Sequence, residues 1–183
     1  GIGPRGGIVR GTKRYVACDT LMLSVGLIPE NELSKKAGTA LSPVTGGPVV
    51  DEDYHTSIPG IFAAGNALQV HDLVDYVSLE AAVAGQKAAG FAGTGQGRQA
   101  NITVGAGQGI RYVVPQRISG AAAVEFTMRV TAPDNDRNIV FSRDGQVIRR
   151  LKQSVLAPSS MIRLRVRADR FQGLDGDMIV EVR

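Results

Sequence analysis

The stretch TSIPGIFAAGN, residues 56–66, decides how the first half of the chain is interpreted. Its proline–glycine pair predicts a tight turn. The apolar run from Ile61 to Ala64 predicts a short strand buried on both faces. Gly65 has no side chain, so backbone can lie against a ligand there. Asn66 then adds a short polar side chain at the carboxyl end of the strand, which is where open α/β sheets bind their ligands.

A helix is predicted directly after this stretch, from Leu73 to Phe91. Asp72 is a candidate N-cap, and Asp75 is an acidic residue suited to the positive start of the helix. One buried stripe is indicated by apolar residues at helical spacing: Leu73, Val77, Ala81, Ala84 and Ala88. The free N–H groups at the start of the helix would point at a partly anionic group.

Upstream, the sequence predicts further strands and a short helix. Tyr15 to Val25 is a near-continuous apolar stretch, which predicts a buried strand and makes Cys18 a buried core thiol. Residues 30–37 predict a short helix closed by Gly38, and residues 48–50 a short strand. The first part is therefore expected to be α/β.

Downstream, the periodicity changes from helical to period two. Residues 124–131 and 162–168 alternate apolar with polar side chains, and Asp144-Gly145 between two such runs is a strong hairpin signal. Residues 178–182 predict a last strand. About six short strands without helices indicate a small β-sandwich or barrel. We expect three segments: an α/β part over 1–92, a linker over 93–100 and an all-β module over 101–183.

The net charge of +4 is unevenly distributed. Residues 1–100 carry −1 and residues 101–183 carry +5, so any basic surface belongs to the second part. Arg163, Arg165 and Arg167 form one polar face of a strand that lacks aromatic residues for base stacking. Nucleic-acid binding is not favoured. A solvated face, or one that docks the acidic surface of a partner subunit, is the preferred interpretation.

Composition excludes several classes of protein. No apolar span is long enough for a membrane helix, and no secretory signal is visible at the start. A single cysteine and two histidines exclude a disulfide framework and a Cys/His zinc site. One cysteine also fits a reducing compartment, so a cytoplasmic location is expected.

Two motifs resemble a known family. Residues 56–66 resemble the second flavin-binding motif of the FAD-dependent pyridine nucleotide-disulfide oxidoreductases. Residues 19–29 (DTLMLSVGLIP) resemble the stretch where the chain of those enzymes returns from the NAD(P) domain to the FAD domain. The sequence HDLVDYVSLEA, residues 71–81, is similar to sequences from one branch of the family. That branch contains glycerol-3-phosphate dehydrogenase-like proteins and the large subunits of opine, sarcosine and cyanide-forming amino-acid oxidases.

The resemblance implies a site. The acidic residue that closes the family's second motif bonds the ribityl chain of FAD, and Asn66 holds that position here. An amide can still donate to and accept from hydroxyl groups. The start of the following helix would face the flavin, which places Gly65, Asn66 and residues 71–74 (His71, Asp72, Leu73, Val74) at the cofactor. For His71 two interpretations stay open: a solvated loop residue, or a group near the flavin or substrate.

The resemblance also implies a larger enzyme. The family's first motif, G-x-G-x-x-G between a strand and a helix, is not found, because residues 1–6 match its letters without that context. We expect a carboxyl-terminal portion of an oxidoreductase that uses FAD and NAD(P) on a small-molecule substrate. A second oxidoreductase subunit and self-association are the expected partners. The alternative is a non-catalytic assembly or binding module of a multisubunit oxidoreductase.

Overall fold

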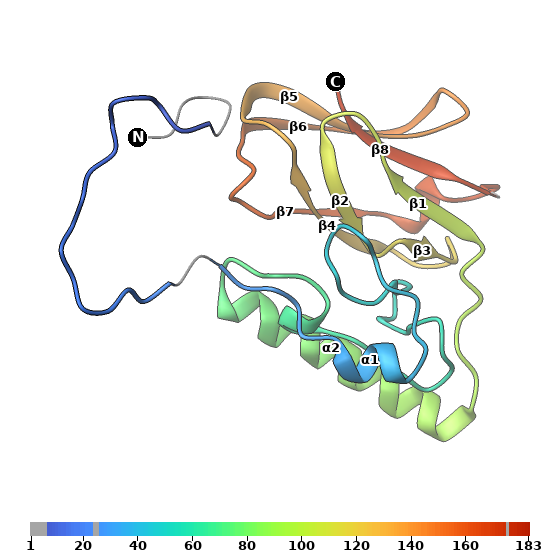
Figure 1. The fold of residues 1–183 in the computed structure, drawn as a ribbon. Coiled ribbons are helices and arrows are strands. Elements are labelled where there is room, and N and C mark those ends of the chain that lie inside the picture. Colours follow the sequence, from blue (N-terminus) through green and yellow to red (C-terminus); the bar gives the residue numbers. More distant parts are fainter. Residues whose placement is uncertain (1–6, 24–25, 175) are drawn as a thin grey trace.

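A computed structural model describes residues 7–23, 26–174 and 176–183. The chain forms a β-sandwich with a long helix and a set of loops beneath it, and residues 7–23 run as an arm away from this body (Figure 1). The helices are α1 (Glu32–Lys36) and α2 (Val74–Thr94), with 3-10 turns η1 (Gly65–Ala67) and η2 (Ala168–Arg170). The strands are β1 (Ile102–Ala106), β2 (Ile110–Val114), β3 (Arg117–Ile118), β4 (Val124–Val130), β5 (Asp134–Arg143), β6 (Gln146–Leu156), β7 (Ile162–Val166) and β8 (Met178–Val182).

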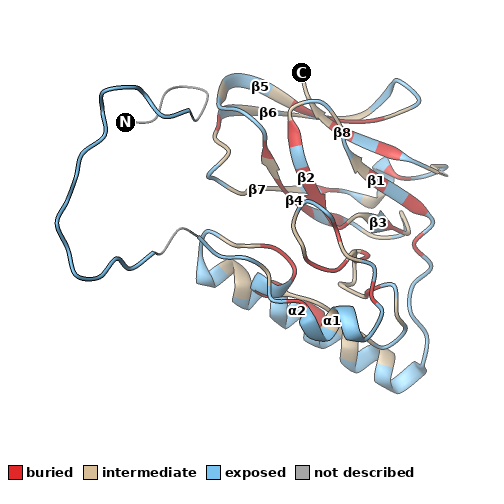
Figure 2. Ribbon diagram, in the orientation of Figure 1, coloured by how far each residue is buried: buried red, intermediate tan, exposed pale blue. Residues whose placement is uncertain are grey.

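The strands form two sheets, with the orders β3-β1-β8-β5-β6 and β2-β4-β7. β1 and β8 pair in parallel, and the other named pairs are antiparallel. Large apolar side chains from both sheets meet in one core, where Phe126 lies 5.1 Å from Phe141 and 6.4 Å from Phe171 between ring centroids. The two sheets therefore share one core, and Figure 2 shows buried residues along their strands.

Local signals placed the strands of the sandwich well. In β4 the side chains of Val124, Phe126, Met128 and Val130 are all buried, as period two predicts. Asp144 and Gly145 both have positive φ (47° and 79°), which is the geometry of a two-residue hairpin turn between right-twisted strands. β8 begins and ends at the predicted residues.

The predicted helices are also present. α1 lies within the predicted range 30–37, and Gly38 follows it with φ +78°. α2 begins at Val74, one residue after the predicted start, and continues past Phe91 to Thr94, where Gly95 ends it in the left-handed conformation. Val77, Ala84 and Ala88 lie on the less exposed side of α2, but Leu73 and Ala81 are exposed. The chain thus has mixed α/β content with two sheets, while the division at 92 and 100 stays a prediction.

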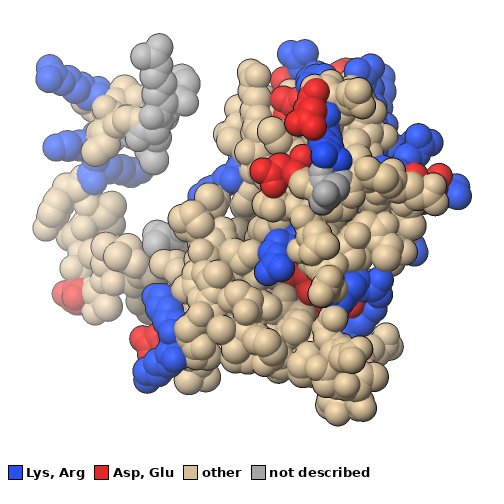
Figure 3. Space-filling view, turned by 90° about the vertical axis from the view of Figure 1, so that its right-hand side faces the viewer, with Lys and Arg blue, Asp and Glu red and all other residues tan. Residues whose placement is uncertain are grey.

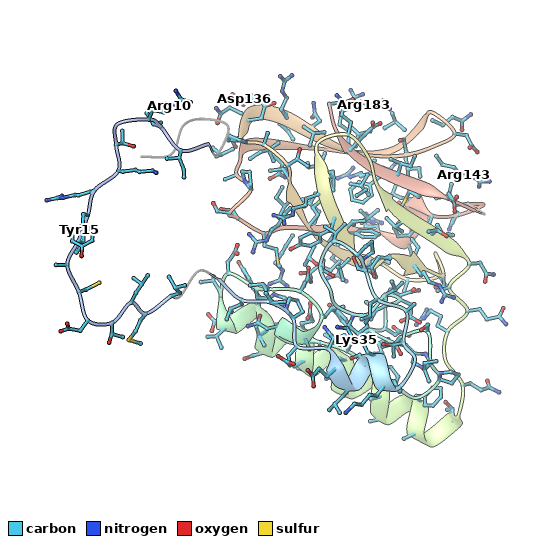
Figure 4. The ribbon with its side chains drawn as sticks, viewed as in Figure 1. Arg10, Tyr15, Lys35, Asp136, Arg143 and Arg183 are labelled. Carbon is cyan, nitrogen blue, oxygen red and sulfur yellow. The ribbon has the colours of Figure 1, made fainter. Side chains whose placement is uncertain are left out.

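The buried strand expected over residues 15–25 is wrong for its described part. Residues 15–23 form no strand, and Tyr15 and Met22 are 92% and 90% exposed. Cys18, expected in the core, is exposed as well. A strand buried on both faces needs neighbouring strands and covering helices, but residues 15–23 are exposed throughout, and Figure 4 places Arg10 and Tyr15 away from the body. Residues 24–25 of that prediction, and the G-x-G-x-x-G letters at 1–6, lie outside the described residues.

The strand expected from Ile61 to Ala64 is likewise not formed. Phe62 makes one isolated bridge with His55, and all four residues of the run are half-buried. Pro48, in the other short strand predicted here, makes one isolated bridge with Leu41. Aromatic stacking fixes this segment instead, since the His55 ring lies 4.6 Å from Phe62 and 5.0 Å from Phe91 of α2. Within the described ranges, the part before α2 contributes no strand to either sheet.

Candidate functional site

Gly65 provides the tight backbone turn of the motif. Its φ is +67°, a conformation that L side chains rarely adopt, and an added Cβ would lie 3.1 Å from Val77 of α2. The residue is buried, and its N–H donates to Glu80 Oε1 at 2.6 Å. Gly65 is therefore packed against α2, and its amide is already bonded to the protein.

Asn66 lies beside Gly65 at the surface. Its side chain is exposed, and Oδ1 accepts the backbone N–H of His71 at 3.1 Å. Within the described part of the chain the Nδ2 group has no partner. The side chain therefore orients the turn into residue 71 and keeps two N–H donors available to solvent.

His71 is not the solvated loop residue that one interpretation expected. Its side chain is 2% exposed, and Nε2 lies 3.1 Å from Oε1 of Glu80, whose side chain is 4% exposed. The other ring nitrogen, Nδ1, is buried with no hydrogen-bond partner among the described residues. The ring is held in the interior by a carboxylate on α2.

Glu80 organises a buried polar network that the sequence interpretation missed. Its Oε2 accepts from Gln69 Nε2 at 3.2 Å, and the same Nε2 donates to Thr127 Oγ1 of β4 at 2.7 Å. Gln69 is fully buried, and its Oε1 has no partner among the described residues. Together Gly65, His71, Glu80, Gln69 and Thr127 join the turn, the loop, α2 and the sandwich. A signal was available, because Glu80 lies three residues after Val77 and four before Ala84 on the buried side of the helix.

Asp72 does not cap α2 as predicted. Its carboxylate accepts from the Arg129 guanidinium of β4 and, at 2.6 Å, from the backbone N–H of Met161. Arg129 also donates to Val70 O at 3.2 Å and to Tyr112 Oη at 3.1 Å. A charge-assisted hydrogen bond to a guanidinium is stronger than a bond to a backbone amide, so the Asp72 carboxylate binds Arg129 rather than the first turn of α2.

The start of α2 is consequently left without a side-chain cap. The N-cap position is Leu73, in extended conformation, and no side chain of the described residues bonds the first-turn amides. Leu73 is 53% exposed and Val74 is 74% exposed. An uncapped first turn at the end of a 21-residue helix presents N–H groups and positive dipole to whatever lies there.

A cavity of about 390 Å³ lies between α2 and the strands β4 and β7. Its lining includes His71, Glu80, Tyr54, Glu125 and Arg163. Burial, together with the charges of Glu80 and Glu125, raises the pKa of the Tyr54 hydroxyl well above 10. The Arg163 guanidinium lies 4.1 Å from the Tyr76 ring centroid and donates to Glu125 at 2.6 Å. The volume is within the range of small-molecule sites.

Six predicted site residues thus lie in one connected region. Asn66, Leu73 and Val74 are exposed, while Gly65 and the His71 side chain face inward to Glu80, and Asp72 is bonded to the sandwich. A model of the pyridine nucleotide-disulphide oxidoreductase family matches residues 4–109, more than half of the chain. The chain belongs to this family. No curated protein and no solved structure matches it.

Membership of the pyridine nucleotide-disulphide oxidoreductases identifies the chain with FAD- and NAD(P)-linked redox enzymes. The residues present fit a flavin nucleotide in two respects. The Nδ2 group of Asn66 is free to bond a hydroxyl, and the first turn of α2 is uncapped. The described residues include no cluster of side chains suited to a metal ion. None of the described helices combines the length and hydropathy that a membrane span requires.

Proposed function

We propose that the chain is the carboxyl-terminal portion of an FAD- and NAD(P)-dependent oxidoreductase and seats the ribityl chain of the flavin at Asn66. The free side-chain amide of Asn66, exposed at the motif's position, is the observation that carries this proposal. Membership of the pyridine nucleotide-disulphide oxidoreductases supports the cofactor class.

The start of α2 supplies the second contact. Because Asp72 is bonded to Arg129, the first-turn amides at Leu73 and Val74 remain available for a flavin carbonyl. When bound, the flavin would accept a hydride from NAD(P)H or a reduced substrate. The role of this chain is to orient the cofactor and to hold positive helix dipole where negative charge develops.

Gly65, His71 and Glu80 lie beneath Asn66 and hold the turn that would contact the flavin. Glu80 fixes the Gly65 amide and the His71 ring, so the turn that carries Asn66 has one orientation. The exposed apolar arm is also consistent with a larger FAD domain, since residues such as Tyr15 and Met22 suit a strand covered by other elements. For the substrate we propose the glycerol-3-phosphate or amino-acid dehydrogenase type, on the similarity of residues 71–81.

The test is flavin retention by the full-length protein. Asn66→Ala is compared with Asn135→Ala, which removes an exposed asparagine from β5. We expect the unaltered protein to show the visible absorbance of oxidised flavin, and Asn66→Ala to bind FAD about three- to tenfold more weakly. Asn135→Ala should bind as the unaltered protein does.

Two results would count against the proposal. Full-length protein that neither purifies with flavin nor binds added FAD would favour the alternative, a non-catalytic assembly module. Equal affinities of Asn66→Ala and Asn135→Ala would show that the ribityl seat lies elsewhere.

A further inference from the structure

A small cleft on the sandwich is lined almost entirely by arginine. Its volume is about 190 Å³, and its lining residues are Arg149, Arg165, Arg167, Asp169 and Arg170. They come from β6, β7 and η2, and Arg167 lies between the last two elements. Four arginines and one aspartate therefore line one hollow.

The topology explains how they meet. β6 and β7 are edge strands of the two sheets, and Arg165 of β7 and Arg167 directly after it flank the buried Val166. The turn η2 follows β7 at once and returns Arg170 to the same place. Charged side chains on edge strands protect sheets from pairing with other chains. That function accounts for arginine on each strand, but it does not require convergence from three elements.

The guanidinium groups of the cleft are largely unpaired. Among the described residues, Arg167 pairs with Asp169 at 3.4 Å, while the side chains of Arg149, Arg165 and Arg170 have no ion pair or hydrogen bond. Other arginines of the sandwich are bonded, such as Arg129 to Asp72 and Arg163 to Glu125. On the face shown in Figure 3, acidic side chains likewise lie between the basic ones over the sandwich.

We propose that this cleft binds a phosphate-class oxyanion, either inorganic phosphate or the phosphoryl group of a small metabolite. Guanidinium groups present planar pairs of donors that match phosphate oxygens. The cleft is smaller than the roughly 300–1,000 Å³ of sites that enclose whole drug-sized ligands, so it suits a single anionic group. No aromatic residue lines it, so stacked bases have no platform there. The proposal does not depend on flavin binding.

Calorimetric titration of the full chain with sodium phosphate, against sodium chloride at matched ionic strength, tests the site. Arg165→Gln is compared with Arg150→Gln, which removes the same charge from an exposed residue of β6 outside the cleft. We expect phosphate binding without chloride binding, at least about tenfold weaker in Arg165→Gln and within about twofold of the unaltered chain in Arg150→Gln. Arg149→Gln is a second cleft variant, in case Arg165→Gln alters the fold.

Titration with phenyl phosphate distinguishes the two sources of the anion. Tighter binding than inorganic phosphate assigns the cleft to a phosphorylated metabolite, and equal binding assigns it to free phosphate. Absence of phosphate binding would overturn the proposal. It would also be overturned by equal losses in Arg165→Gln and Arg150→Gln, or by binding confined to polyanions such as heparin, since both results indicate general surface charge.

Discussion

Residues 102–182 and residues 26–94 fold around different kinds of interior. The core cluster of the sandwich contains sixteen buried apolar residues, and two buried polar ones, Thr127 and Ser142, lie in its strands. In the described part of 26–94 the balance is reversed. Its buried apolar side chains are Pro48, Val50, Leu68 and Ala84, whereas its buried polar residues are Asn31, Thr39, Ser42, Asp51, Thr56, Gln69 and Glu80.

The fold of residues 26–94 therefore depends on specific hydrogen bonds and on packing against the sandwich. Val50 and Leu68 form a small cluster only together with Tyr112 and Val114 of β2. Asn31 donates to the carbonyl oxygens of Gly46 and Ala67, at 3.0 and 2.7 Å, and so joins loops distant in the sequence. Apolar burial resists change through many weak contacts, while a buried polar network fails locally when one partner is lost. The candidate flavin-binding residues lie in residues 26–94, the region held together by buried polar groups.

The largest effect is expected in the sandwich core. Phe126→Ala removes a fully buried ring that contacts Phe141 and Phe171, and should lower the free energy of unfolding by about 3–5 kcal/mol. Urea denaturation measures it. Val155→Ala, at a residue 70% exposed, should change it by less than about 0.5 kcal/mol. Similar values for the two variants would contradict the packed core described here.

A smaller and local effect is expected at Glu80. Glu80→Ala leaves the Gly65 N–H and Gln69 Nε2 without their carboxylate, which should cost about 2–3 kcal/mol. Hydrogen exchange should show faster opening at Gly65 and in α2, with the amides of β4 and β5 little changed. Gln86→Ala, at an exposed residue of α2, is the control. Equal acceleration throughout the sandwich would mean that the two regions unfold as one unit.

The link between the regions is measurable through Asp72 and Arg129. A double-mutant cycle with Asp72→Ala and Arg129→Ala should give a coupling energy of about 1–2 kcal/mol, because the pair is partly buried and further hydrogen bonds orient the guanidinium. Thermal unfolding of the four proteins supplies the values. A coupling near zero would show that the other bonds of Arg129 suffice to hold residues 70–72.

The smallest effect concerns pH. Burial raises the pKa of Asp51 above its ordinary value of 3.8, so the folded state holds the proton more tightly than the unfolded state. The resulting stabilisation is full below pH 3.8 and is lost as pH rises through the folded pKa. Asp51→Asn keeps an Oδ1 acceptor for the amides of Asp53 and His55 and cannot ionise.

The variant should therefore gain stability relative to the unaltered chain as pH rises from 3 to 6. The size of this gain follows from the difference between the folded and unfolded pKa of Asp51, at about 1.4 kcal/mol for each whole unit. Denaturation at several pH values measures the difference. A difference that falls over this range would show that the charged form of Asp51 is the stabilising one.

The sequence predicted those elements of the fold whose structure depends only on residues within a short segment. The alternation in 124–130, the Asp144-Gly145 turn and the helix through Phe91 were all predicted, because period and turn geometry are properties of a short segment. The apolar run 15–23 has the composition of a buried strand, yet it is exposed, since burial depends on neighbours rather than on composition.

The candidate site likewise contains some residues that the sequence predicted and others that it did not. Gly65 and Asn66 could be found from the sequence, because the turn and the polar side chain lie within one motif. Glu80 could also be found, from its place on the buried side of α2, but the bonds of Gln69 to Thr127 across 58 residues and of Asp72 to Arg129 across 57 could not. By itself the sequence determined the strands at 124–130 and 178–182, the Asp144-Gly145 turn and the motif, which rest on interactions between residues close along the chain. Only the tertiary structure decided which polar groups are buried together, because hydrogen bonds between distant segments leave no periodic signal.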